Sequence, residues 1–438
     1  MCAQLLAGAA SVVITPPVGL DLCGFGGRPG PSEAVHDDLH AKALYLGPAE
    51  GDGQQVIIIT CDLIGLDRES VREIRQAIAA QTGVPAGSIM IGCSHTHSGP
   101  ATPCIASLGK VDAAYMAVLK RSIVGAAKMA YDGRQPAALG SLREPISVGI
   151  NRREMREQGM TIGRNERGLT APWVDVVAVD TMAGQPLARF FVHAAHAVTL
   201  SGQDITADWP GYAQSIVERI YGEGCVAMFG QGCCGNINSD PRGTYEVAEA
   251  QGRAMAGAVV KAAEYATKEP EVAIACGSVD LALPCFDPPS VAEAQAQLEA
   301  LKQTAANRPE RNYGLDMMGA GDVAWAERIL ALAQAGATNL TRAYEVQAIR
   351  LGDFVLVGLP GEVFVEYALQ IDEGAAYRQT ATMAYANDNV GYVPTAAAYE
   401  EGGYEVTHAI RFYGDTMLRP EGERMIVAAA LELARGLR

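Results

Sequence analysis

The chain has 438 residues, of which 49% are hydrophobic and 19% charged, so it is long and apolar enough to bury a large core. Its net charge of −16 argues against nucleic acids and anionic membrane surfaces as partners. The sequence shows no basic, apolar leader and no apolar run near the ~20 residues that span a bilayer. We therefore expect a cytoplasmic protein with no stable membrane association.

The ten cysteines show no repeated C-x-x-C spacing that would indicate a structural zinc site. Several stand inside apolar runs, where a free thiol behaves as a small hydrophobe. Reduced, unpaired cysteines are the expectation.

A strand–helix–strand unit is predicted near the N-terminus. Residues 55–62 form an apolar run that is typical of a strand buried on both faces, and Asp62 ends it. A helix follows over 68–81, with Asp67 as its N-cap, and a second short strand covers 88–93. Ahead of this unit, the glycine-rich loop 24–30 is either a surface turn or a loop that approaches a ligand. The pair His36 and Asp37 is either catalytic or part of a solvated turn.

His95 and His97 follow the strand over 88–93. On an extended backbone, residues two apart project from the same face, so both rings are expected side by side. They could share a metal ion, or one could bind the metal while the other transfers a proton. Six of the seven histidines fall in three close pairs before residue 200, which favours such a site over two solvated rings.

Further candidates follow other predicted strands. His193 ends the apolar strand 188–193, and His196 follows three residues later. Glu362 follows another strand and a Pro-Gly turn. The loop 231–241 either presents backbone amides to an oxyanion or is a simple connector. The charged segment 154–167 is predicted to be a loop, and 288–306 and 320–335 two helices of a peripheral hairpin.

Spaced blocks along nearly the whole chain then form one pattern: Thr15-Pro-Pro-Val-Gly-Leu20, His36-Asp37, Cys61-Asp62-Leu63, His95-Thr-His-Ser-Gly-Pro100, Asn151-Arg152, Val192-His193, Asp208 with Gly211-Tyr212, Gln231–Asn238, Pro360-Gly-Glu362, and Gly391-Tyr392 with Tyr404. In these blocks the chain resembles the N-terminal catalytic domain of the neutral/alkaline (non-lysosomal) ceramidase family. The His-Thr-His-Ser-Gly-Pro block is the most specific of them.

The resemblance implies one catalytic zinc ion held by four residues: His95, His193, Glu362 and Tyr392. Nitrogen and oxygen ligands of this kind suit zinc, which would activate a bound water for attack on a carbonyl. His97 matches the family's second histidine and is the expected general acid/base. The resemblance also implies that Arg152 and Tyr404 hold the carbonyl oxygen or the substrate.

The chain departs from the family in three ways. Asn238 stands where the family has a serine near the scissile amide, unless the loop shifts by one residue. A secretion signal and a C-terminal β-sandwich domain are also expected to be absent. The two expected absences together weaken the case for ceramide as the substrate, and Asn238 changes the hydrogen-bonding character next to the scissile bond.

The expected fold is therefore a large α/β (mixed α+β) catalytic domain over 1–438, with mixed sheets flanked by helices, the metal site at strand ends and a helical insertion over 286–340. The expected function is zinc-dependent hydrolysis of a linear amide in a small N-acyl compound. Ester or lactone hydrolysis by the same chemistry is one alternative, and a non-catalytic zinc-binding homologue is the other. A homo-oligomer is left open.

Overall fold

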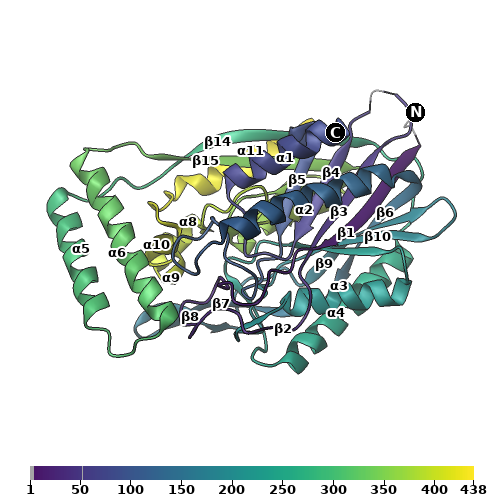
Figure 1. Ribbon diagram of the computed structural model, residues 1–438. Helices are drawn as coiled ribbons and strands as arrows, with labels where there is room; N and C mark the ends of the chain where they lie inside the picture. Colours follow the sequence, from purple (N-terminus) through teal and green to yellow (C-terminus); the bar gives the residue numbers. More distant parts are fainter. Residues whose placement is uncertain (1–3, 52) are drawn as a thin grey trace.

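The computed structural model describes residues 4–51 and 53–438, and over these ranges two large β-sheets pack face to face between layers of helices (Figure 1). The larger sheet contains, in spatial order, β12 (Val226–Gln231), β10 (Pro186–His193), β9 (Trp173–Thr181), β6 (Gln135–Pro145), β1 (Leu5–Val13), β3 (His40–Pro48), β4 (Val56–Cys61) and β5 (Ile89–Cys93). The smaller contains β14 (Ile274–Pro284), β15 (Thr341–Leu351), β16 (Phe354–Gly358) and β18 (Gln379–Met383). The mixed α/β prediction is confirmed.

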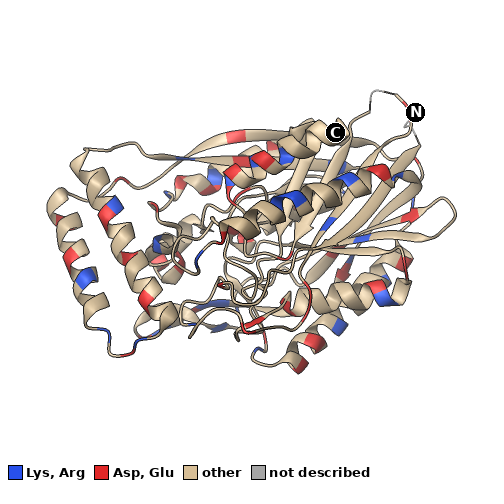
Figure 2. Cartoon of the chain, viewed as in Figure 1, with Lys and Arg blue, Asp and Glu red and all other residues tan. Residues whose placement is uncertain are grey.

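Strand β4 shows why the central strands are apolar on both faces. Ile58 belongs to the core between the two sheets, whereas Ile57 and Ile59 point into the core under the helices. Because side chains alternate along a strand, a strand covered on both sides has no place for polar residues. Charged residues accordingly lie mainly on helices and loops (Figure 2).

Helices cover the outer faces of the two sheets. Helices α2 (Ala113–Asp132), α3 (Asp208–Tyr221) and α4 (Tyr245–Tyr265) pack on the larger sheet, and α1 (Arg68–Thr82) packs against α2. Helices α7 (Val365–Gly374) and α11 (Glu421–Gly436) pack on the smaller sheet. Among the described residues, none of the helices has the length and apolar character needed to cross a membrane.

The predicted strand–helix–strand unit is present. Strands β4 and β5 are parallel neighbours, with Cys61 opposite Cys93, and α1 connects them through the short 3-10 helix η1 (Ala86–Ser88). The Asp67 side chain accepts a hydrogen bond from the Ser70 amide, as an N-cap should, and Gly83 ends the helix in the left-handed conformation. Both ends of α1 are therefore specified locally.

The segment 154–167, predicted as a loop, is instead largely part of a hairpin. Strand β7 (Gly149–Arg156) turns at Gly159 into β8 (Gly159–Asn165), and β13 (Ile237–Ser239) pairs with β7 on its other side. Gly159 has a φ of 107°, which the tight turn requires. The many charged residues misled the prediction because much of this small hairpin is solvent-exposed.

The remaining elements are short, apart from one helix pair. They are β2 (Ala34–Val35) with β11 (Asp204–Ile205), β17 (Glu362–Val363) with β19 (Tyr392–Val393), α8 (Ala396–Glu401), α9 (Tyr404–Thr407) and α10 (Ile410–Tyr413). Helices α5 (Val291–Ala306) and α6 (Tyr313–Gln334) pack on each other at the far end of β14 and β15 (Figure 1). Helix α6 begins earlier than residue 320 because Asn312 caps it.

Nine cysteines lie within the described residues, and all nine are free, as expected. Cys2 lies outside the described residues.

Asp208 fixes the segment that follows β10. It is fully buried, has a φ of 59°, and accepts hydrogen bonds from the amides of Leu200 and Trp209. The Trp209 indole in turn donates to the carbonyl of His196. Burial raises the pKa of Asp208 to about 6, even though the Leu200 and Trp209 amides oppose that rise.

We expect this carboxyl group to make the stability of the protein depend on pH. Because its pKa is higher in the folded chain, its contribution is complete below about pH 4 and is lost as the pH rises through about 6. A rise from 3.8 to about 6 corresponds to roughly 3 kcal/mol. Urea unfolding measures the free energy of unfolding of wild type and of Asp208→Asn, and the difference between the two should change by about this amount between pH 4 and pH 6. A difference that stays constant with pH would contradict the expectation.

Candidate metal centre and active site

The site forms where two edge strands of the larger sheet meet. Strands β5 and β12 stand at opposite ends of the strand order, yet they contact each other. Gln231, the last residue of β12, links the segments that follow β5 and β10: its side chain donates to the carbonyl of Ser94 and accepts from the amide of Ala195. One buried amide thereby holds the backbones beside His95 and His196 together.

His95 lies just beyond β5 and is not extended. Its φ is 58°, a left-handed conformation that is uncommon for a residue with a side chain. The expected extended strand through His95 and His97 is therefore wrong, because β5 ends at Cys93. The two rings still meet, with their Nε2 atoms 3.1 Å apart. The ring of Tyr385, also at positive φ, stacks on His95 at 4.1 Å between centroids.

His196 lies three residues beyond β10 and is fully buried. Its Nδ1 donates to the carbonyls of Cys234 and Ile237, at 2.7 and 2.9 Å. His95 is held in the same way, because its Nδ1 donates to the carbonyl of Ile64 at 2.7 Å. Since a carbonyl only accepts, both Nδ1 atoms carry a proton, and the Nε2 atoms are the ring nitrogens that face the site.

Glu362 completes this group. It opens β17, opposite Tyr392 of β19, and its Oε2 lies 3.2 Å from Nε2 of His196 and 3.5 Å from Nε2 of His95. Its Oε1 accepts a hydrogen bond from the hydroxyl of Tyr413. Burial alone would raise the pKa of Glu362, but the neighbouring His95 and His196 hold it well below its usual range.

His97 differs from the other two histidines. The nearest ring nitrogens of His95, His97 and His196 lie within 4.8 Å of one another, so the three could hold a metal ion. However, His97 is partly exposed, and its Nδ1 is buried with no hydrogen-bond partner among the described residues. Burial and the adjacent His95 and His196 lower its pKa well below the usual value. No backbone carbonyl fixes its tautomer.

The group of His95, His196 and Glu362 fits a bound cation. Each contributes an atom of a type that binds metal ions, and Oε2 of Glu362 lies 3.2 Å from Nε2 of His196 and 3.5 Å from Nε2 of His95. Burial, with help from Arg152, lowers the pKa of His196 to about 4, so its Nε2 is unprotonated at neutral pH. Backbone carbonyls on the far ring nitrogens are the usual outer partners of metal-binding histidines.

The structure does not bring His193 into this group, which corrects the expectation that it supplies the second imidazole. Its Nδ1 donates to the carbonyl of Trp173 at 2.7 Å, and its Nε2 accepts from the amide of Val148 at 3.5 Å. Burial lowers its pKa to about 4. His193 is still within the regular pairing of β10, so its ring is committed to the core, whereas His196 lies in the irregular segment that crosses the site.

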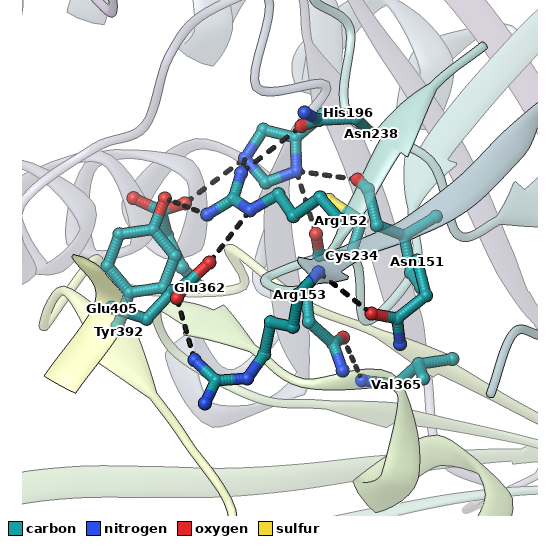
Figure 3. Close-up of polar contacts among 12 residues, drawn as sticks. Asn151, Arg152, Arg153, His196, Cys234, Asn238, Glu362, Val365, Tyr392 and Glu405 are labelled. Atoms are coloured by element: carbon teal, nitrogen blue, oxygen red, sulfur yellow. Dashed lines mark hydrogen bonds and ion pairs between the residues drawn. The ribbon is translucent and has the colours of Figure 1, made fainter. Parts of the chain in front are cut away.

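Arg152 joins several of the other predicted residues (Figure 3). Its Nη2 donates to the hydroxyl of Tyr392 at 2.7 Å, and its Nη1 donates to Oδ1 of Asn238 at 3.2 Å. The same Nη1 lies 3.4 Å from Nε2 of His196. Asn238 is in β13 and faces this site, while the next residue, Ser239, accepts a hydrogen bond from Thr199 instead. No shift of the loop brings Ser239 into the place of Asn238.

Tyrosines line the more exposed side of the site. Tyr404 is partly exposed and lies edge-on to Tyr392, with ring centroids 5.8 Å apart. Tyr413, which binds Glu362, was not predicted, and neither were Tyr385 and Glu405 as parts of the site. The sequence offered one missed signal: His196 was visible as the second member of a histidine pair at a strand end.

The other sequence candidates have structural roles. Asp37 accepts hydrogen bonds from Thr206 and Ala207, and His36 bonds to the hydroxyl of Tyr212. In the loop 231–241, the amides of residues 235 and 237 donate to backbone carbonyls, so they are not free to bind an oxyanion. The glycine-rich loop does approach the site, because a Cβ at Gly24 would lie 2.4 Å from Cγ of His97.

Comparisons with known proteins identify the fold. No protein-family model and no curated protein sequence match the chain. Solved structures do match, and two of them are neutral ceramidase from Pseudomonas aeruginosa, with a TM-score of 0.73 and 18% identity over 99% of this chain and 75% of that one, and a ceramidase complexed with C2, with a TM-score of 0.74 and 17% identity over 100% and 75%. The chain therefore has the neutral ceramidase fold, and the resemblance seen in the sequence is confirmed at that level.

The two buried histidines three residues apart provide a matched test of the metal centre. We expect His196→Asn to lose most of the bound metal, since it removes a bare Nε2 from the group. His193→Asn should retain the metal, because its ring bonds only to backbone groups. Elemental analysis of the folded variants, checked by circular dichroism, measures both. Metal retained in His196→Asn and lost from His193→Asn would reverse the assignment.

Proposed function

We propose that the protein is a zinc-dependent hydrolase that cleaves a linear amide bond in a small N-acyl compound. The observation that carries the proposal is the convergence of His95, His196 and Glu362 on one point, inside a ceramidase fold. Two imidazole nitrogens and a carboxylate oxygen are a donor set that zinc prefers in catalytic sites.

His95, His196 and Glu362 would hold the ion, with Tyr392 as the proposed fourth ligand. Tyr392 lies directly opposite Glu362 in the β17–β19 pair, and Arg152 supplies a positive charge at its hydroxyl. A bound zinc ion would polarise the amide carbonyl and lower the pKa of a water molecule. His193, which the family resemblance suggested, has no part in this set.

His97 is proposed as the group that moves protons. It lies next to the metal-binding group, is partly exposed, and has an Nδ1 with no partner among the described residues. A ligand histidine usually has its other nitrogen fixed by a hydrogen bond, as His95 and His196 do. The ring of His97 can therefore change protonation at either nitrogen, which suits transfer of a proton to the leaving amine.

Arg152 and Asn238 are proposed to bind the acyl carbonyl region, with Tyr404 at the open side. A guanidinium group only donates, so the contact with Arg152 fixes Oδ1 of Asn238 toward it. The amide nitrogen of Asn238, which makes no hydrogen bond within the described residues, is then free to donate to the substrate. A serine hydroxyl at this position would not offer an amide oxygen to Arg152 and an amide nitrogen to the substrate. We therefore propose that the substrate is a polar acyl compound and not ceramide.

The proposed reaction is tested by assaying zinc-loaded protein side by side on soluble N-acyl amides, matching esters and short-chain ceramide in detergent. We expect turnover of a soluble amide with kcat/KM of at least ~10⁴ M⁻¹s⁻¹, the low end of ordinary enzymes. Turnover of ceramide alone would contradict the substrate class, and turnover of esters alone would contradict amide cleavage.

His97→Ala separates proton transfer from metal binding. We expect the variant to keep its zinc and to lose roughly 10²–10⁴-fold in kcat, the usual contribution of a general acid/base group. Elemental analysis and steady-state kinetics measure the two properties in one preparation. If zinc is lost together with activity, His97 is a ligand and its proposed role is wrong.

A further inference from the structure

The guanidinium group of Arg152 uses Nε for a structural contact and its two terminal nitrogens for the site. Its Nε donates to Oε1 of Glu405 at 2.9 Å. Its two terminal nitrogens contact Tyr392, Asn238 and His196 (Figure 3). Because the group is planar, the bond at Nε determines the direction of both terminal nitrogens.

Glu405 is itself held firmly. It is 1% exposed, and its second oxygen, Oε2, accepts from Nη1 of Arg153 at 2.8 Å. Arg153 also donates to the carbonyl of Gly402 and to the partly exposed carboxylate of Glu401. With an arginine on each oxygen, the carboxylate of Glu405 cannot turn away from Arg152 without breaking a second buried ion pair.

We propose that Glu405 is a positioning residue for the reaction, which directs the terminal nitrogens of Arg152 at the carbonyl region of the substrate. The effect on catalysis rests on the proposed function, whereas the positioning of Arg152 by Glu405 is argued from the contacts alone. An arginine side chain has several rotatable bonds, and holding it in one geometry before the substrate binds reduces the entropic cost of the reaction.

The charges around Arg152 agree with this role. The residue is almost completely buried, and burial alone would lower its pKa. Tyr392, Glu405 and Glu362 reverse this effect and hold the pKa well above its usual value. Of the carboxylates, Glu405 is the one in direct contact with the guanidinium group.

The test compares Glu405→Gln and Glu405→Asp with Glu401→Gln. We expect Glu405→Gln to keep its metal and to lose about 10–100-fold in kcat, as is usual when an outer hydrogen-bonding partner is removed, with a smaller change in KM. Glu405→Asp keeps the charge but is one methylene shorter, so an intermediate loss is expected. Glu401→Gln, which touches Arg153 but not Arg152, should match wild type.

A second readout needs no turnover: the side-chain Nε–H signal of Arg152 in an NMR spectrum, assigned with Arg152→Lys. We expect this signal to move or to exchange faster with water in both Glu405 variants and to stay unchanged in Glu401→Gln. If wild type cleaves no amide, the proposed function fails while the NMR result still decides the positioning. If either folded Glu405 variant keeps both the wild-type signal and the wild-type kcat, the positioning role is overturned. If Glu405→Gln does not fold, Glu405→Asp alone provides this test.

Discussion

The site depends on a set of hydrogen bonds that turns the Nε2 atoms of His95 and His196 toward the carboxylate of Glu362. The carbonyls of Ile64, Cys234 and Ile237 accept hydrogen bonds from Nδ1 of His95 and His196, and the Nε2 atoms then lie within 3.5 Å of a carboxylate oxygen. Two imidazole nitrogens beside a buried carboxylate oxygen form a donor set that suits a metal ion. The backbone around the site therefore holds in place a group of side chains that could bind a cation.

The surrounding structure maintains this arrangement from several directions. Gln231 joins the two histidine segments, Tyr385 stacks on His95, and Tyr413 binds the second oxygen of Glu362. The residues come from distant parts of the chain, and two rigid sheets bring them together. His95 and Tyr385 both adopt left-handed backbone conformations, and strain of this kind persists where the surrounding packing determines it.

Much of the fold could be predicted from the sequence, and the site only in part. The apolar run of β4 and the capped helix α1 carry strong local signals, so their positions were predicted closely. His95 and Glu362 were candidates because each follows a predicted strand. The sequence could not show whether His193 or His196 belongs to the metal-binding group. The answer depends on the residue at which the regular pairing of β10 ends, because His193 is still paired and faces the core while His196 lies beyond the strand. Glu405 and Tyr413 had no local signal, since their roles come from contacts with residues more than 50 positions away.

The central claim is that a single zinc ion binds between His95, His196 and Glu362. Anomalous X-ray diffraction at the zinc absorption edge, on crystals of the zinc-loaded wild-type protein, tests it most directly. The account predicts one strong peak within bonding distance of the Nε2 atoms of both histidines and of Oε2 of Glu362. A peak at His193, or no peak in this group while zinc is bound elsewhere, would contradict it.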